Sequence, residues 1–176
     1  EIRLLFSACD RLGTFGNLCK VLLYTAQRRT LVATMRFDDI DDGVWTVPEE
    51  DAVGDEKGNI ECVRLPKPVL DIIEEQAKLR INEFVFPASR VGRRDGPGEN
   101  FGSFSAFGQG KADLDKAMAE LAPTMKVPHW TLHDLRRTTA TLMPRIGIDD
   151  EHRERVLGHK IAGVKGVYNR YKYLNE

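Results

Sequence analysis

Residue types that can take part in polar chemistry gather in the C-terminal third of this chain. His133 and Arg136 stand three residues apart in the segment Thr131-Leu-His-Asp-Leu-Arg-Arg. On a helix, this spacing turns both side chains to the same side. The pair would therefore place a titratable imidazole beside a permanent cation. Taken alone, such a pair is more often part of a solvated surface than of a catalytic site.

Two further motifs follow the first. In the triplet Leu-Gly-His at 157–159, a glycine that ends a short helix leaves His159 at the helix C-terminus, where the dipole favours a histidine. A capping role explains this triplet by itself. Tyr168 lies nine residues later, with Tyr171 and Tyr173 close behind. Tyrosines in such a helix are usually packing or edge residues.

The elements that must position these residues are mainly helical. Residues 17–36 form a long helical pattern with Asn17 as a candidate N-cap, and Gly13 and Gly16 interrupt the chain before it. Arg28 and Arg29 lie near the C-terminal part of this apolar helix, where charged side chains commonly extend toward solvent. The full set of predicted helices covers residues 1–11, 17–36, 69–82, 111–121, 131–146, 149–157 and 164–174.

Two segments predict β-structure. Residues 44–47 are β-prone and end at Pro48, and residues 60–65 alternate apolar and polar side chains. A polar loop that contains Lys57-Gly58-Asn59 joins them, which indicates a small antiparallel sheet. Residues 87–110 are rich in glycine, serine and arginine and are expected to form a long loop. The predicted fold class is mainly α with a small antiparallel β-sheet (α+β).

Charge is distributed unevenly along the chain. The net charge of −1 argues against a nucleic-acid partner. Acidic residues, however, dominate between residues 37 and 75, and basic residues dominate from Lys126 onward. One face could therefore attract a polyanion despite the neutral average. Two solvated helix faces of opposite charge are the alternative interpretation.

Composition indicates a cytoplasmic protein. Cys9, Cys19 and Cys62 have no metal-ligand spacing and are expected to be reduced thiols. The histidines lack a neighbouring cysteine or carboxylate cluster, so no metal site is predicted. The sequence has no apolar run long enough to cross a bilayer and no signal-peptide pattern, so no membrane partner is expected.

The order and spacing of these motifs carry more information than any one of them. An early arginine, a lysine in a β-turn, H-x-x-R, L-G-H and a tyrosine nine residues later occur here in that order. The segments TLHDLRRTTATL, RVLGHK and GVYNRYKY resemble the prophage-integrase branch of the tyrosine recombinases, also called phage integrases. The TAQRR helix followed by DDIDDGVWTVPEE is similar to the N-terminal catalytic helix and sheet of that family. The resemblance covers essentially the whole chain and implies the tyrosine-recombinase catalytic-domain fold.

The resemblance implies an enzyme that integrates or recombines DNA at specific sites by transesterification. Tyr168 matches the nucleophile, which becomes attached to the DNA through a 3′-phosphotyrosine bond. His133 matches the candidate base for the phenol proton, and Lys57 the candidate acid for the leaving 5′-oxygen. Arg28 matches the first family arginine in preference to Arg29, because that arginine follows the helical threonine by three residues.

Arg136 matches the second family arginine, and His159 matches a histidine that hydrogen-bonds a phosphate oxygen. Two guanidinium groups fit the geometry of a phosphodiester and stay protonated at any working pH. They can supply the electrostatic stabilisation that metal ions give in other phosphoryl-transfer sites. The phosphotyrosine link conserves the bond energy, so neither a metal nor a nucleotide cofactor is expected.

The resemblance also implies partners. It predicts double-stranded DNA carrying attachment sites, a homo-tetramer on DNA for the full-length protein, and accessory DNA-bending factors as further candidates. Residues 1–176 correspond to the catalytic domain alone, without the N-terminal DNA-binding domains of the family. The fragment is therefore expected to be monomeric by itself and to bind DNA weakly.

The chain departs from the family pattern at two positions. Ala26 replaces a glycine, and Leu31 stands where the family has an acidic residue that supports the site. One alternative is therefore a catalytically impaired recombinase-fold protein that only binds DNA. A second alternative is a helix-turn-helix regulator that uses residues 149–157 and the basic tail. The latter does not explain Arg28, Lys57 or the spacing from His159 to Tyr168.

Overall fold

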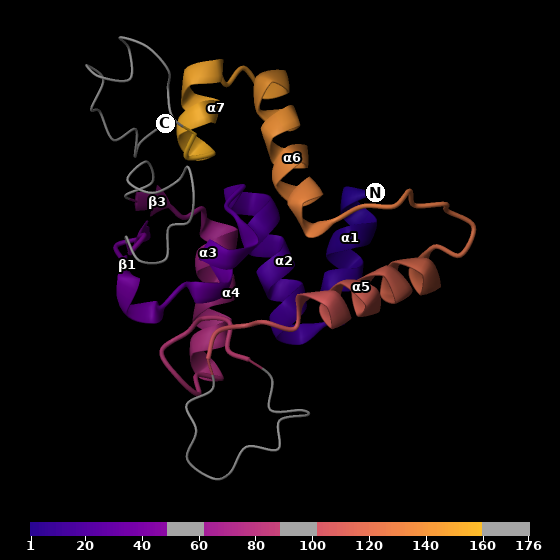
Figure 1. Cartoon of the computed structure of the whole chain (residues 1–176), viewed down its shortest axis with the longest axis horizontal. Helices are drawn as coiled ribbons and strands as arrows, with labels where there is room; N and C mark the ends of the chain where they lie inside the picture. Colours follow the sequence, from indigo (N-terminus) through magenta and orange to yellow (C-terminus); the bar gives the residue numbers. More distant parts are fainter. Residues whose placement is uncertain (49–61, 89–101, 160–176) are drawn as a thin grey trace.

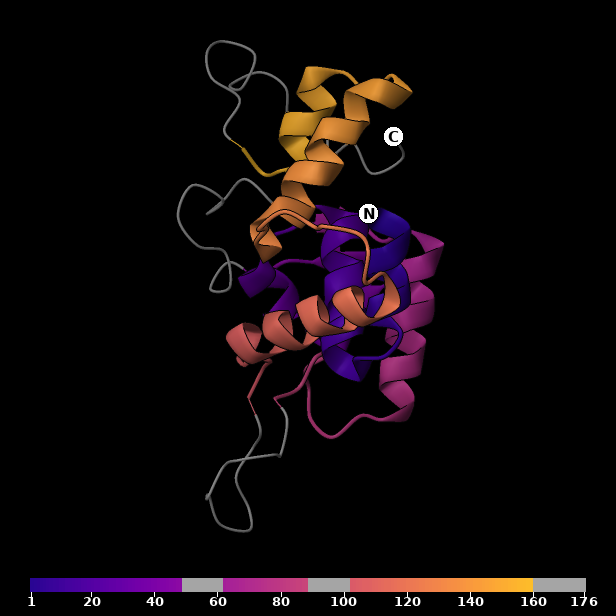
Figure 2. The ribbon, with the colours of Figure 1, turned by 90° about the vertical axis from the view of Figure 1, so that its right-hand side faces the viewer.

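The computed structural model describes residues 1–48, 62–88 and 102–159 of the chain, and helices make up most of them. The helices are α1 (Ile2–Cys9), α2 (Gly13–Thr25), α3 (Arg29–Thr34), α4 (Lys67–Lys78), α5 (Phe107–Leu121), α6 (Leu132–Leu142) and α7 (Asp150–Val156), with 3-10 turns η1 (Phe37–Asp39) and η3 (Met143–Ile146). Both views place α6 and α7 together at one end of the molecule, beside the helical body formed by α1, α2 and α5 (Figures 1 and 2).

A small antiparallel sheet follows α3. Its strands are β1 (Ile40–Asp41), β2 (Val44–Thr46) and β3 (Cys62–Arg64), in the spatial order β1-β2-β3. Asp42 and Gly43 both have positive φ angles, of 44° and 71°, which suits the tight hairpin between β1 and β2. Trp45, at the centre of β2, is 1% exposed. The α+β fold class predicted from the sequence is confirmed.

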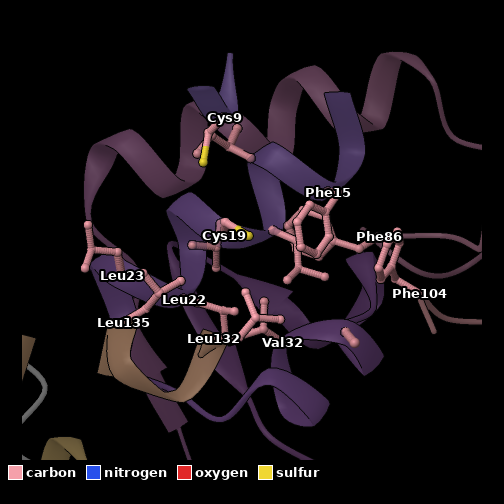
Figure 3. Packing of buried hydrophobic residues seen from close by; sticks show 14 of the residues in the cluster. Cys9, Phe15, Cys19, Leu22, Leu23, Val32, Phe86, Phe104, Leu132 and Leu135 are labelled. Atoms are coloured by element: carbon pink, nitrogen blue, oxygen red, sulfur yellow. The ribbon is translucent and has the colours of Figure 1, made fainter. Parts of the chain in front are cut away.

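The main hydrophobic core lies between α2 and its neighbours. Leu132 and Leu135 of α6 reach the same cluster as Leu22 and Leu23 of α2 (Figure 3). Aromatic side chains fill the other end, where the rings of Phe15 and Phe104 lie 5.4 Å apart between centroids. Helix α2 is thus covered on several sides, which fixes the position of its C-terminal end.

The crossing of α1 and α2 is unusually close at Gly16. A Cβ atom built on Gly16 would lie 1.9 Å from the carbonyl oxygen of Cys9 at the end of α1. Gly16 therefore has a packing role inside α2. The sequence had indicated an interruption of the chain at Gly16, and that prediction is wrong. Asn17 also lies inside α2, which begins at Gly13 after the N-cap Leu12, so the predicted Asn17 cap is wrong.

The predicted helix 17–36 is divided in two. Helix α2 ends at Thr25, Ala26 adopts a left-handed conformation with φ 56° and ψ 18°, and α3 begins at Arg29. Helical periodicity continues across the break because α3 also buries an apolar side, including Leu31 at 0% exposure. The position where the family pattern has an acid is therefore an apolar core position here.

The other helix boundaries differ less from those predicted from the sequence. Helix α5 starts at Phe107 instead of residue 111, and the ring of Phe107 packs on that of Phe104 with centroids 5.4 Å apart. The predicted helix 131–146 is α6 followed by η3, and Pro144 lies in this tighter turn. The predicted tail helix 164–174 lies outside the described residues. Within the described ranges, no helix is long and apolar enough to cross a membrane, and no cluster of three metal-binding side chains occurs.

Candidate active site

Helix α6 carries the H-x-x-R motif, and its first turn is fixed by a cap. The carboxylate of Asp134 accepts hydrogen bonds from the backbone N–H and the hydroxyl of Thr131, both at 2.9 Å. These donors, with a smaller contribution from Arg137, hold the pKa of Asp134 below its ordinary value. The predicted N-cap at Thr131 is confirmed. Leu135 and Arg136, which follow the capped turn, are both buried.

Arg136 makes the contacts that join the candidate site in the described part of the chain. Its side chain is buried, with 5% exposure. Nη1 donates to the carbonyl of Ala26 at 2.9 Å, and Nη2 donates to the carbonyl of Leu157. Nη2 also lies 3.3 Å from Nε2 of His159. One guanidinium group therefore joins the end of α2, the end of α7 and the histidine of the L-G-H motif.

The turn between α2 and α3 brings Arg28 to the same region. Gln27, which is 1% exposed, donates from Nε2 to the carbonyls of Thr25 at 3.0 Å and Val156 at 2.8 Å. Arg28 follows directly as the N-cap residue of α3 and is half-buried. The turn and the end of α7 are thus tied together by two side chains, Gln27 and Arg136.

The two arginines that follow this turn have different surroundings. Arg29 is exposed, and its guanidinium carbon lies 5.0 Å from the ring centroid of Phe107, in a cation–π contact with α5. Arg28 instead follows Ala26 and Gln27, the two residues that contact Arg136 and α7.

His159 owes its position to the end of α7. Asp149 caps the start of this helix by accepting from the backbone N–H of His152 at 2.9 Å. At the other end Gly158 has φ 64°, and the backbone N–H of His159 donates to the carbonyl of Glu154 at 2.9 Å. With the bond from Gly158 N–H to the Arg155 carbonyl, also 2.9 Å, this is a Schellman motif.

The Schellman motif folds the chain back over the last turn of α7. The imidazole of His159 consequently meets the side chain of Glu154, with 2.7 Å between Nδ1 and Oε2. Sequence reasoning missed this glutamate and also missed Gln27. The signal for Glu154 was present, because a glycine directly before His159 predicts the motif, and the motif places His159 beside the residue five positions earlier.

The remaining predicted site residues are not all brought together. His133 is exposed on α6, whereas Arg136 three residues later is buried. The two share a helix but not an environment, because the ridge of α6 that carries Arg136 faces α2 and α7. Lys57 and Tyr168 lie outside the described residues. The structure thus brings Arg136 and His159 together, and Arg28 follows the turn that Arg136 contacts.

Comparisons with known proteins identify the family and the fold. Residues 2–174 match the model of the phage integrase family, and the chain belongs to that family. A search of curated proteins finds no match. Solved structures of tyrosine recombinases share the fold, at low sequence identity.

Three of these structures illustrate the range of the likeness. The XerA recombinase is 17% identical with a TM-score of 0.65, over 94% of this chain and 58% of its own. A λ integrase tetramer bound to a Holliday junction is 18% identical with a TM-score of 0.62, over 92% of this chain and 45% of its own. The λ integrase catalytic core is 18% identical with a TM-score of 0.62, over 89% of this chain and 90% of its own. The chain thus spans about half of the longer recombinases.

Proposed function

We propose that residues 1–176 are the catalytic domain of a site-specific DNA recombinase, which breaks a DNA strand and rejoins it through a phosphotyrosine bond at Tyr168. The main support is the buried Arg136, whose guanidinium lies against His159 and is tied to the turn that leads into Arg28. Such a group is suited to hold a phosphodiester, because its planar donors match two phosphate oxygens and keep their charge.

In the proposed cleavage step, the Tyr168 oxygen forms a bond to phosphorus while the bond from phosphorus to the 5′-oxygen breaks. His133 accepts the phenol proton, and its exposure on α6 is consistent with a role toward bound DNA. Lys57 gives a proton to the leaving 5′-oxygen. Rejoining reverses these steps with a 5′-hydroxyl as the attacking group, so no nucleotide cofactor is consumed.

Arg28, Arg136 and His159 would bind the non-bridging oxygens of the same phosphate. The charge on these oxygens grows as the Tyr168 oxygen attacks, and donors fixed in advance stabilise that growing charge most effectively. The carbonyls of Ala26 and Leu157 hold Arg136 in place before DNA arrives. Because Arg136 is held in place in this way, we assign it a catalytic role although its side chain is buried.

We propose double-stranded DNA with attachment sites as the substrate and a homo-tetramer on DNA as the working assembly of the full-length protein. The λ integrase structure of a tetramer on a Holliday junction supports this assembly by analogy. With DNA as the substrate, we propose that the protein acts in the cytoplasm. Leu31, which is apolar and buried at the position of the family acid, favours one second candidate: a protein of this fold that binds DNA without cleaving it.

Covalent attachment separates the two candidates. The full-length protein is incubated with nicked suicide duplexes made from the sequences that flank its gene, and protein–DNA adducts are resolved on denaturing gels. We expect an adduct with the parent and none with Tyr168→Phe. Tyr171→Phe is the matched control and should retain attachment. An adduct of equal yield with Tyr168→Phe would contradict the assignment, and specific binding without any adduct would favour the second candidate.

A further inference from the structure

Glu154 and His159 form a contact that the proposed chemistry does not yet use. The carboxylate of Glu154 divides its two oxygens between two neighbours. Oε2 lies 2.7 Å from Nδ1 of His159, and Oε1 accepts from Nη2 of Arg153 at 3.0 Å. The hydrogen bond from His159, followed by that from Arg153, holds the pKa of Glu154 below its ordinary value. The carboxylate is therefore ionised and acts only as an acceptor near neutral pH.

The opposite side of the imidazole faces an arginine. Nε2 of His159 lies 3.3 Å from Nη2 of Arg136. A guanidinium nitrogen can only donate, so the neutral imidazole must accept at Nε2. Its single proton is then on Nδ1, where the Glu154 carboxylate accepts it. The two contacts agree with each other, because both require the same tautomer of His159.

The backbone enforces this geometry. The Schellman motif at Gly158 brings His159 back over the last turn of α7, so the Glu154 and His159 side chains meet although five residues separate them. Arg136 is held on the other side by the carbonyls of Ala26 and Leu157. The imidazole therefore lies between a fixed acceptor and a fixed donor.

We propose that Glu154 is a positioning residue for His159, which fixes the proton on Nδ1 and keeps Nε2 directed toward Arg136 and the phosphate site. This inference rests on the proposed function: a phosphate oxygen can only accept, so the ring that binds it carries a proton on Nε2 as well as on Nδ1, and Glu154 accepts the Nδ1 proton in both forms. Without the carboxylate, the ring loses the acceptor that holds its Nδ1 proton. An Nε2–H tautomer would then set two donors against each other at Arg136. The ring would turn away from the position at which Nε2 can reach bound DNA.

The test combines a spectroscopic readout with DNA attachment. The full-length protein is labelled with 15N-histidine, and the His159 signal is assigned by its loss in His159→Gln. We expect a protonated Nδ1 and an unprotonated Nε2 in the neutral ring of the parent. Glu154→Gln keeps an acceptor oxygen and should preserve this tautomer. Glu154→Leu should shift the ring toward Nε2–H and lower the rate of covalent attachment by about tenfold or more.

A matched control lies on the same helix. Arg153→Leu removes the second partner of Glu154 but leaves the contact with His159, so the tautomer should not change. If Glu154→Leu keeps the parent tautomer, Glu154 does not position His159. The NMR result does not depend on cleavage, whereas failure of the proposed recombinase function would appear as a parent protein that forms no Tyr168 adduct.

Discussion

The close contact between Gly16 and the end of α1 allows a quantitative test of the structure. A Cβ atom at Gly16 would lie 1.9 Å from the Cys9 oxygen and 2.7 Å from the Cys9 carbonyl carbon. Ordinary contact begins near 3.4 Å. Both atoms of the Cys9 carbonyl belong to the backbone, so no side-chain rotation can relieve the clash. In Gly16→Ala, α1 and α2 must therefore separate by about 1.5 Å at their crossing.

The energetic effect of this separation is large. A gap of about 0.5–1 Å already removes roughly a quarter to a half of the dispersion attraction across an interface. On the α1 side this interface includes the buried residues Leu5, Ala8 and Cys9. Overpacking of a well-filled core costs about 1–3 kcal/mol when side chains can adjust, and more when backbone must move. We therefore expect Gly16→Ala to lower the free energy of unfolding by about 3 kcal/mol or more.

Urea unfolding followed by circular dichroism measures this change, and a domain of this size should lose roughly 6–12 °C in Tm. Gly108→Ala in α5 is the matched control, because a Cβ at Gly108 meets no atom within 4 Å. Alanine there should be neutral or stabilise the helix by up to about 1 kcal/mol. A Gly16→Ala protein within about 0.5 kcal/mol of the parent would refute the close crossing of α1 and α2.

Two further predictions concern the residues around the site. Ala26 has φ 56° and is 0% exposed; Ala26→Val should destabilise the protein by about 2 kcal/mol or more, because a β-branched residue is strained in this conformation and has no space. Ala26→Gly should change the unfolding free energy by less than about 1 kcal/mol. Glycine relieves the strain of the left-handed conformation, which stabilises the protein. The lost burial of the methyl group and the greater freedom of the unfolded chain destabilise it by a similar amount. Equal stability of the Val and Gly variants in urea would contradict the left-handed conformation. Arg136→Lys should lower stability by about 1–3 kcal/mol and DNA attachment by about a hundredfold, because one ammonium group cannot reach the carbonyls of both Ala26 and Leu157. Normal attachment by this variant would show that the paired donors of Arg136 are dispensable.

Local sequence signals predicted those parts of the fold that depend on local physics. Thr131 and Asp134 stand at capping-box spacing, and the start of α6 follows from that spacing alone. The break of the helix at Ala26 could not be predicted in this way. Alanine favours helix, and the apolar pattern of α2 continues into α3, so local propensity and periodicity both indicated one helix. Contacts from α6 and α7 to the turn, made by Arg136 and Gln27, accompany the left-handed conformation.

The same distinction applies to the site. The spacing of His133 and Arg136 placed them on one helix, but it could not show that Arg136 is buried while His133 is exposed. That difference arises because α6 packs against α2 on one side only, and long-range packing is not encoded in a three-residue spacing. Glu154 was overlooked for a different reason. Its partner His159 lies beyond the end of the helix, where helical spacing rules no longer apply and the Schellman turn decides which side chains meet.

The contacts of Arg136 therefore depend on the backbone at two places in the chain. Arg136 donates to the carbonyl of Ala26 in the left-handed turn and to the carbonyl of Leu157 at the end of α7. Gln27 also joins the turn to the end of α7, because its side chain donates to the carbonyl of Val156. Since α2 carries this turn and packs closely on the end of α1 at Gly16, we expect a packing change there to alter the distance between the two carbonyls that Arg136 joins. The phosphate-binding geometry proposed here is thus a property of helix packing as much as of the motif residues.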